Sequence, residues 1–416
     1  MIQLIRGFKD ILPGEVETWQ HIEKTAQALF ADFGFNEIRI PIMERTELFA
    51  RSIGEDTDIV EKEMYTFPDR KGDLLTLRPE ATASVVRSYL QHKMHADDPV
   101  KKFYTIGPMF RRERPQKGRY RQFYQINAEV FGVASSLIDV ELIFVLMTLM
   151  SRLAVADVSA HINSLGCAEC RPDYRQALKR FLASVDDRLC ADCRRRRDRN
   201  PLRVLDCKVP TCRETIANAP SILDHLCDDC RRDFDHVQVH LRKLQIPFQV
   251  DPRLVRGLDY YTRTTFEIQT GSLGAQSAVA GGGRYDGLAK LLGGPDIPAT
   301  GFAIGLDRLA EIAGIHADTP APHLFIAALG ENCRDVVFPW ICELGRSGIR
   351  AEMDFNDRSL KAQMKRADKL QAAYVMILGE DELQKGSAIL RNMRTRGQVP
   401  IAIDAVIERL KDILKQ

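Results

Sequence analysis

Apolar side chains at helical spacing predict three helices in the first half of the chain. Residues 14–33 carry an apolar stripe on one helical face, which consists of Val16, Trp19, Ile22, Ala26, Leu29 and Phe33. Residues 79–91 open with a proline, which suits the first turn of a helix. Residues 137–153 are apolar almost throughout, so we expect this helix to be buried.

Alternating apolar and polar positions predict a pair of strands at residues 103–110 and 123–130. The first strand runs into a basic loop, which carries Arg111, Arg112, Arg114, Lys117, Arg119 and Arg121. On this pattern alone, a solvated basic hairpin is slightly favoured over a binding site. Residues 301–309 read as a short apolar strand, a glycine and the start of a helix that carries Arg308.

Strands and helices alternate after the polar, proline-rich segment 316–323. The predicted strands are HLFIAAL, IRAEMDF, AAYVMILG, SAILRNMRT and QVPIAI, and the predicted helices cover residues 333–346, 359–371 and 404–415. This alternation predicts a small α/β domain with a mostly parallel sheet.

Composition and charge narrow the class of protein. A chain of 416 residues suffices for two or three domains, and 45% hydrophobic with 28% charged residues is ordinary for a globular enzyme. The net charge of +2 means that any contact with nucleic acid depends on local basic patches. No apolar run is long enough to span a bilayer, and the N-terminus lacks a secretory core, so we expect a cytoplasmic protein with no membrane partner.

Eight of the ten cysteines lie between residues 165 and 232. They form four closely spaced pairs, Cys167 with Cys170, Cys190 with Cys193, Cys207 with Cys212, and Cys227 with Cys230. In a cytoplasmic chain such cysteines are reduced thiols or metal ligands rather than disulfides. Eight thiolates suit two structural Zn²⁺ ions in tetrahedral sites, and ordinary free thiols are the alternative. The spacing leaves open which pairs would share an ion.

Residues 253–267, RLVRGLDYYTRTTFE, combine arginines, acidic residues and two adjacent tyrosines. This mixture suits a pocket for a ligand that is both charged and of aromatic size, and an amphipathic strand with solvated arginines is an equal alternative.

Three segments together resemble the signature motifs of class II aminoacyl-tRNA synthetases. They are residues 33–44, 103–132 and 301–309, in the order of the family. Residues 253–267 resemble the segment with which histidyl-tRNA synthetases recognise histidine, and we refer to them as the recognition segment. RGFKDILPGE, LTLRPEAT and AGGGRYDGL also agree with that family. The resemblance covers nearly the whole chain and is weakest in residues 165–232.

The resemblance implies an α+β catalytic domain at residues 1–315, built on an antiparallel sheet with helices. A cysteine-rich insert at residues 165–235 interrupts it. A linker at 316–322 and an α/β anticodon-binding domain at 323–416 would follow. The family forms homodimers through the first motif.

The implied activity is that of a histidine–tRNA ligase, which converts L-histidine and ATP, supplied with Mg²⁺, to histidyl-adenylate and pyrophosphate and then transfers histidine to the 3′ end of tRNA(His). The residues that match ATP contacts are Arg111, Glu113, Arg119, Phe123 and Arg308, and those that match catalytic positions are Arg111, Arg256 and Arg308. In this family an arginine takes the place of a metal ion near the α-phosphate, and Arg256 matches it. The alternative for Arg256 is a structural ion pair with Asp251 or Asp259.

The resemblance also implies a histidine pocket. The residues that match it are Glu80, Ala81, Thr82, Arg111, Gln125, Glu129, Arg256, Tyr260, Tyr261 and Tyr285. Glu80, Thr82 and Gln125 match contacts of the α-amino group. Glu129 and Tyr261 match the partners of the two imidazole nitrogens. Simple core packing is the alternative for the tyrosines.

Two other functions compete with this interpretation. A paralogue of these synthetases senses histidine as a regulatory subunit, but it has degraded ATP motifs and lacks the C-terminal domain. A class II synthetase of another specificity is the second, and LDYYTRTTFE argues against it. The run Arg194–Arg197 is either a solvated helix face or a contact for the acceptor stem of tRNA.

Overall fold

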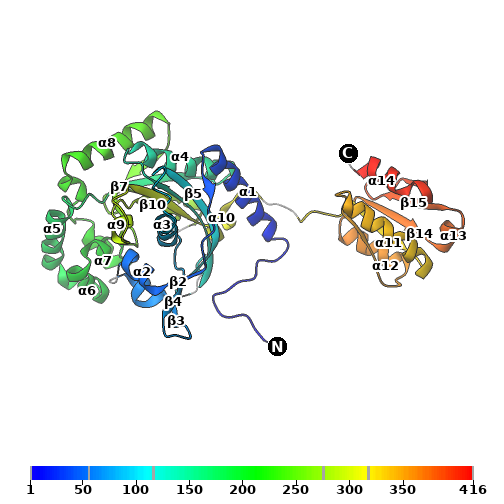
Figure 1. Ribbon diagram of the computed structural model, residues 1–416, viewed down its shortest axis with the longest axis horizontal. Coiled ribbons are helices and arrows are strands. Elements are labelled where there is room, and N and C mark those ends of the chain that lie inside the picture. Colours follow the sequence, from blue (N-terminus) through cyan, green and yellow to red (C-terminus); the bar gives the residue numbers. More distant parts are fainter. Residues whose placement is uncertain (1, 55–56, 115–117, 274–276, 316–318, 415–416) are drawn as a thin grey trace. The chain divides into compact units, whose positions relative to one another are not determined.

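The chain folds into two compact units, Met1–Ala317 and Asp318–Gln416 (Figure 1). The structure is a computed structural model that describes residues 2–54, 57–114, 118–273, 277–315 and 319–414. Lys117 of the predicted basic loop and residues 316–318 of the predicted linker lie outside these ranges.

An eight-stranded sheet organises the first unit, in the order β1-β5-β6-β11-β10-β9-β7-β8. Its strands are β1 (Asn36–Glu37), β5 (Lys101–Phe110), β6 (Gln122–Phe131), β7 (Val158–Ser164), β8 (Phe248–Val250), β9 (Thr262–Thr270), β10 (Ala278–Arg284) and β11 (Ala299–Gly305). The six inner strands pair antiparallel, and each edge strand pairs parallel with its neighbour. The predicted hairpin of β5 and β6 runs in register from Lys101 opposite Phe131 to Phe110 opposite Gln122.

Helices pack on both faces of this sheet. The larger core joins the sheet to α1 (Val16–Asp32), α4 (Leu137–Arg152), α8 (Asp228–Lys243) and α10 (Leu306–Ile312). The predicted apolar stripe of α1 enters this core, because Trp19, Ile22, Ala26 and Leu29 are buried. The opposite face carries α3 (Thr82–Gln91) and α9 (Leu288–Leu291).

A small antiparallel sheet lies beside this second face, with β2 (Met43–Arg45), β4 (Leu74–Leu77) and β3 (Tyr65–Pro68). The short α2 (Thr46–Ile53) and a π-helical turn at Ile59–Glu63 connect these strands.

The cysteine-rich region is helical and has a core of its own. It contains α5 (Arg171–Ser184), α6 (Ala191–Arg199), α7 (Pro210–Ile216) and 3-10 turns at Asp186–Arg188, Pro201–Asp206 and Ile222–His225. The next helix, α8, begins at Asp228, inside the predicted insert at 165–235. Cys230 lies on the buried face of α8 with Phe234, Val237 and Leu241. This predicted metal ligand therefore also belongs to the apolar stripe of the helix. Among the residues that the structure describes, no helix has the length and apolar character needed to cross a membrane.

The second unit is a mixed sheet of five strands, ordered β13-β12-β14-β15-β16. Its elements are β12 (Leu324–Ala328), α11 (Glu331–Arg346), β13 (Ala351–Met353), α12 (Leu360–Lys369), β14 (Tyr374–Leu378), α13 (Glu380–Gln384), β15 (Ser387–Asn392), β16 (Gln398–Ala402) and α14 (Val406–Leu414). β12 pairs parallel with β13 and β14, but β15 pairs antiparallel with both neighbours. The prediction of a mostly parallel sheet was therefore wrong for the last two strands. Their connection is too short for a parallel crossover.

Candidate functional site

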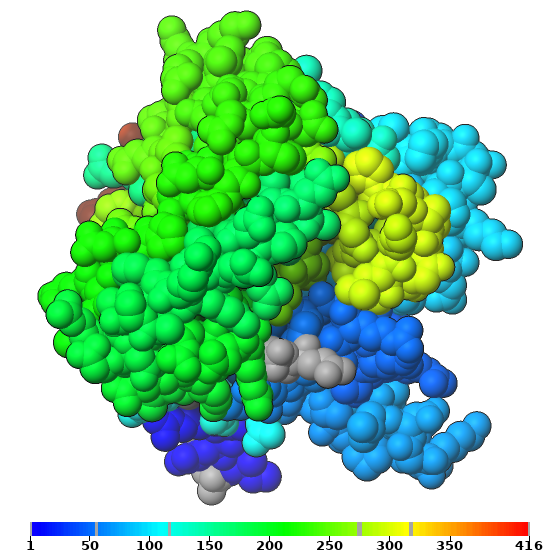
Figure 2. All heavy atoms as spheres, turned by 90° about the vertical axis from the view of Figure 1, so that its left-hand side faces the viewer, coloured from blue at the N-terminus to red at the C-terminus, as the bar shows by residue number. Residues whose placement is uncertain are grey.

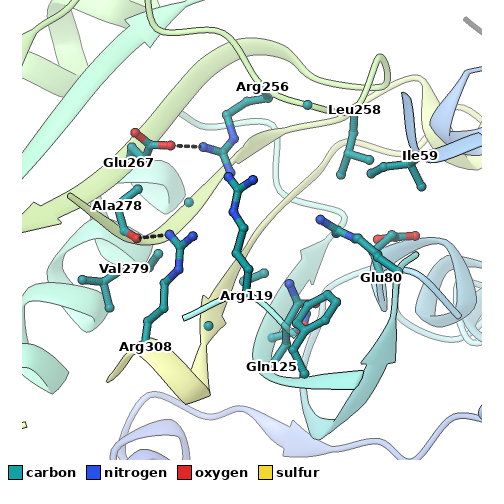
Figure 3. Close-up of a pocket in the computed structure, with 18 of the residues that line it drawn as sticks. Ile59, Glu80, Arg119, Gln125, Arg256, Leu258, Glu267, Ala278, Val279 and Arg308 are labelled. Carbon is teal, nitrogen blue, oxygen red and sulfur yellow. Dashed lines mark hydrogen bonds and ion pairs between the residues drawn. The ribbon is translucent and has the colours of Figure 1, made fainter. Parts of the chain in front are cut away.

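A cavity of about 340 Å³ opens on the first unit between the central strands and the recognition segment (Figure 3). The predicted site residues that line it are Glu80, Thr82, Arg111, Glu113, Arg119, Phe123, Gln125, Arg256, Tyr260, Tyr261 and Arg308. Ala81, Glu129 and Tyr285 are buried behind this lining. Residues from β6, β9, β10 and β11 thus meet a turn before α3 and a loop after β8 at one place.

Arg111 lies at the end of β5 among a carboxylate and an aromatic ring. Its guanidinium carbon is 5.2 Å from the centroid of the Phe123 ring, and its Nη1 atom is 3.8 Å from Glu113 Oε1. Arg119 approaches the same carboxylate, at 3.4 Å from Glu113 Oε2. Arg111 Nε donates to the carbonyl oxygen of Pro79 at 2.9 Å, which fixes the direction of the side chain. Two cations, one acceptor and one flat apolar surface are therefore grouped together.

Arg308 reaches the cavity from the first turn of α10. It donates to the carbonyl oxygens of Ala278 at 2.8 Å and Gly118 at 3.3 Å, and Figure 3 shows it extending toward the same space as Arg119 and Arg256. The neighbouring Asp307 accepts a hydrogen bond from the backbone N–H of Tyr124 at 2.8 Å, which ties the start of α10 to β6.

Arg256 lines the cavity near Arg119 and pairs with Glu267. Its Nη1 atom is 2.8 Å from Glu267 Oε1, and its guanidinium carbon is 5.8 Å from the centroid of the Tyr261 ring. Gly281 leaves room for the Arg256 guanidinium in this position, because a Cβ atom there would displace it. The acidic partner of Arg256 is thus neither Asp251 nor Asp259, the two that the sequence suggested. Asp251 instead accepts from the backbone N–H of Arg253, and Asp259 accepts from Asn200.

Glu129 is buried on β6 at the floor of the site. It accepts hydrogen bonds from Thr82 Oγ1 at 2.7 Å and from the Tyr285 hydroxyl. Gly301 on the adjacent strand leaves room for the carboxylate, since a Cβ atom there would overlap it. Burial raises the pKa of Glu129, and the nearby Glu80 adds to the rise. Both hydrogen bonds act in the opposite direction, and the resulting pKa is about 8.

Glu80 is fixed just before α3. Its carboxylate accepts from the backbone N–H groups of Thr82 at 2.7 Å and Ala83 at 2.9 Å. Burial raises its pKa, and these hydrogen bonds lower it. The Tyr260 hydroxyl lies 3.4 Å from the same carboxylate, and the Tyr260 ring centroid is 4.7 Å from that of Tyr261.

The polar floor of the cavity is rich in acceptors. In the described part of the chain, the buried Oε1 atom of Gln125 and Oδ1 atom of Asn127 have no hydrogen-bond partner. With the carboxylates of Glu80 and Glu129, they favour a ligand that carries positive charge and donates hydrogen bonds. The opposite wall is lined by arginines, which favour an anion. The cavity therefore suits a ligand with cationic and anionic ends.

Asn127, Glu267 and Gly281 are among the lining residues that the sequence did not single out. Asn127 could have been found, because it lies between Gln125 and Glu129 at the two-residue period of one strand face. Glu267 ends the recognition segment and bears the charge opposite to Arg256. Gly281 begins a run of three glycines, which is unusual inside a strand and indicates close approach by another group.

The eight cysteines of the insert form two groups of four. The first is Cys167, Cys170, Cys227 and Cys230, the second is Cys190, Cys193, Cys207 and Cys212, and within each the sulfur atoms lie within 4.8 Å of one another. Cys167 Sγ is 3.6 Å from Cys170 Sγ and 3.9 Å from Cys227 Sγ, and Cys190 Sγ is 3.9 Å from Cys207 Sγ. Four thiolates around a tetrahedral Zn²⁺ stand about 3.8 Å apart, so the donor sets fit this ion.

The basic run on α6 is held by ion pairs within the chain. Arg196 lies 2.5 Å from Asp58, and Arg197 lies 2.8 Å from Asp186. Arg194 donates to the carbonyl oxygen of Asp186 at 3.0 Å. Arg196 and Arg197 therefore contact other parts of the protein, whereas the side chains of Arg194 and Arg195 are about half exposed.

Known proteins resemble the whole chain. A family model described as histidyl-tRNA synthetase matches residues 7–309, and one described as anticodon binding domain matches residues 323–413. The protein named histidine–tRNA ligase from Desulfatibacillum aliphaticivorans is 62% identical over 418 residues, which cover 100% of both chains. The protein of the same name from Desulfosudis oleivorans is 63% identical over 98% of this chain and 97% of its own. The crystal structure of apo S. aureus histidyl-tRNA synthetase superposes with a TM-score of 0.83 at 36% identity, covering 99% of this chain and 100% of that one.

Proposed function

The chain belongs to the histidyl-tRNA synthetase family, and from this premise we propose that the cavity described above is where it activates histidine. The enzyme is a histidine–tRNA ligase of class II, which makes histidyl-adenylate and pyrophosphate from L-histidine and ATP with Mg²⁺, and then charges tRNA. The observation that carries the site assignment is the division of the cavity into an acceptor-rich floor around Glu129 and an arginine-lined wall at Arg256 and Arg308.

The arginine wall binds ATP. Arg111 contacts the α-phosphate, Arg308 contacts the γ-phosphate and Arg119 supplies a second phosphate contact. A guanidinium suits these roles because its planar fork binds phosphate oxygens in pairs and keeps its charge. The adenine ring stacks on Phe123 and donates a hydrogen bond to Glu113. This arrangement is supported by the position of Arg111 and Arg119 beside the Glu113 carboxylate and of Arg111 over the Phe123 ring.

Histidine lies across the floor. Its α-amino group donates to Glu80, Thr82 and Gln125 in the turn that also contains Ala81. Its imidazole nitrogens meet Glu129 and the Tyr261 hydroxyl, while Tyr260 and Tyr285 enclose the ring. A side chain that lacks either ring nitrogen leaves a buried polar partner unpaired, which costs about 1–3 kcal/mol.

The reaction joins the two anions. A carboxylate oxygen of histidine forms a bond to the α-phosphorus, the bond from that phosphorus to the bridging oxygen breaks, and pyrophosphate leaves with the bond electrons. Arg256 and Arg111 lie on either side of this centre and stabilise the negative charge that develops on the phosphoryl oxygens. The ion pair with Glu267 at 2.8 Å supports this role, because it restrains the Arg256 guanidinium at the cavity.

The remaining assignments concern partners. Residues 1–315 form the catalytic domain around the insert at 165–235, and residues 323–416 bind the anticodon of tRNA(His) after a linker at 316–322. The enzyme works as a homodimer through the first motif, in the cytoplasm. The match of an anticodon-binding model to residues 323–413 supports the role of the second unit.

The two cysteine groups each bind one structural Zn²⁺ ion. Four thiolates complete a tetrahedral shell and leave no position for substrate, so the ion supports folding rather than chemistry. Support comes from the sulfur separations of both groups.

Pyrophosphate exchange with each of the twenty amino acids tests the proposed function. We expect exchange with histidine and rates lower by a factor of about 10⁴ with the others, because mismatched ligands leave buried polar groups unpaired. A regulatory subunit would bind histidine without exchange. Comparable exchange with proline or threonine would move the specificity to another member of the class.

A further inference from the structure

The cysteine-rich insert touches the recognition segment at its backbone, immediately beside the cavity. Arg203, in the 3-10 turn Pro201–Asp206, donates from Nη1 to the carbonyl oxygen of Arg256 at 3.1 Å. Its guanidinium lies over Gly257, since Nη1 is 3.6 Å from the position that a Cβ atom would occupy there. The Arg203 side chain is 13% exposed, so this contact is largely shielded from water.

A second contact fixes the next turn of the same segment. The side-chain amide of Asn200 donates to both carboxylate oxygens of Asp259, at 2.9 and 3.0 Å. The backbone N–H of Asp259 in turn donates to the carbonyl oxygen of Ile53 at the end of α2. Residues 256–259 are therefore held between the insert and α2, directly before Tyr260 and Tyr261.

The same part of the insert also reaches the other rim of the cavity. Arg196 and Arg203 lie 2.5 and 3.9 Å from the carboxylate of Asp58. Asp58 directly precedes Ile59, which lines the cavity. Figure 2 shows the green insert lying beside the blue segment that contains α2.

The second cysteine group closes the loop that carries these contacts. Cys190 and Cys193 stand at the start of α6, and Cys207 follows the 3-10 turn. Their sulfur atoms lie in one group with that of Cys212. A shared metal ion would thus join both ends of residues 193–207, between which Arg196, Asn200 and Arg203 project.

We propose that Arg203 is a positioning residue for histidine activation, and this inference rests on the function proposed for the cavity. In the described part of the chain, residues 255–258 form no backbone-to-backbone hydrogen bond, so their placement depends on side chains such as Arg203. By holding the Arg256 carbonyl, Arg203 sets where the Arg256 guanidinium and the following tyrosines stand. A displacement of about 1 Å at such a site lowers the rate by up to about a hundredfold.

Substitution of Arg203 in the full-length, metal-loaded enzyme tests this proposal. For Arg203→Gln we expect the KM for histidine in pyrophosphate exchange to rise about tenfold or more, with the KM for ATP changed less than about threefold. Arg203→Lys should recover part of the loss, because its ammonium still donates one hydrogen bond. Arg232→Gln is the matched control, since Arg232 is an exposed arginine of the insert that pairs with Asp229 on its own helix.

Three further readouts separate positioning from folding. Active-site titration should find as many competent sites in Arg203→Gln as in wild type, the metal content should be unchanged, and hydrogen exchange should quicken in residues 253–262. Fewer competent sites with an unchanged KM would show a merely structural role and overturn the proposal. So would wild-type KM and exchange rates in Arg203→Gln. If that variant does not fold, an unchanged histidine KM in Arg203→Lys overturns it. A wild-type enzyme inactive with histidine would refute the proposed function itself.

Discussion

The cavity and the cysteine groups are both clusters of buried ionisable side chains, and they differ in how charge is balanced. In the cavity, charged groups face partners from the protein, as in Arg256 with Glu267 and Glu129 with Thr82 and Tyr285. In each cysteine group, the thiols contact one another, and one thiol also accepts a hydrogen bond from a backbone N–H, Cys170 from Cys227 and Cys212 from Cys190. The protein alone can therefore hold the cavity in shape for transient ligands, whereas four thiolates in contact would repel one another without the Zn²⁺ ion proposed for each group.

The dependence between the two regions therefore has one direction, in which the cavity depends on the insert. The cavity does not hold the insert together, because the insert has its own core. The insert, however, supplies Arg203 and Asn200 to the recognition segment. Disturbing the metal should then reach the cavity, while disturbing the cavity should leave the metal in place.

Replacing Arg256 should give the largest effect. Arg256→Ala removes the fixed cation between the histidine carboxylate and the α-phosphate, and loss of one such contact lowers the rate by about two to three powers of ten. Pyrophosphate exchange measures this loss, and zinc content should match wild type. Exchange within threefold of wild type would show that Arg256 is a structural partner of Glu267 alone.

Replacing Glu129 should give the next largest effect, confined to histidine. Glu129→Gln replaces a carboxyl group, which can ionise when the imidazole donates to it, by an amide that stays neutral, and we expect the KM for histidine to rise about tenfold to a hundredfold. The KM for ATP should change little, because the hydrogen-bond partners of Glu129 are Thr82 and Tyr285 on the floor of the cavity. Equal changes in both constants would place Glu129 in general folding rather than in recognition.

Removing the second metal site should give a smaller effect on the same reaction. In Cys190→Ser with Cys193→Ser, zinc should fall from about two ions to about one per chain, because each site needs four thiolates. The recognition segment then loses its support, so the histidine KM should rise up to about tenfold. Cys342→Ser, at an exposed cysteine of the second unit, is the control. Metal loss with unchanged kinetics would break the link between insert and cavity.

The pH dependence of stability should give the smallest effect. The pKa of Glu129 is about 8 in the folded protein against an ordinary 4.5. Between these values the unfolded chain releases a proton that the folded protein keeps, so the contribution of Glu129 to stability, full below pH 4.5, is lost as pH rises toward 8. Urea unfolding without ligands should therefore show Glu129→Gln gaining stability relative to wild type from pH 5 to pH 8. A constant difference would contradict the raised pKa.

How much the sequence could predict also differs between the two regions. The β5–β6 hairpin followed from local alternation, and the charged and aromatic residues predicted to line the cavity followed from the family resemblance. Which arginine meets which carboxylate did not follow, because Arg256 and Glu267 belong to a loop and a strand whose relative placement is tertiary. Local pattern also missed the antiparallel pairing of β15, since strand direction depends on connection geometry.

In the insert, spacing indicated metal ligands but not their pairing. Cys167 and Cys170 join Cys227 and Cys230 rather than the nearer pairs, because α5 and the start of α8 pack against one core. The grouping is therefore set by helix packing across some sixty residues of chain. The sequence likewise did not predict the contact of Arg203 with the recognition segment, because neither segment has a pattern that indicates contact with the other.

Histidine and ATP bind together in this cavity in the proposed function. A crystal structure with a non-hydrolysable analogue of histidyl-adenylate is the most direct test. We predict that the imidazole lies within hydrogen-bond reach, about 2.6–3.2 Å, of Glu129 and the Tyr261 hydroxyl. The phosphoryl oxygens should lie at the same range from Arg256 and Arg111, with the Arg203 contact to the Arg256 carbonyl intact. An analogue bound elsewhere, or one whose imidazole points away from Glu129, would contradict the account.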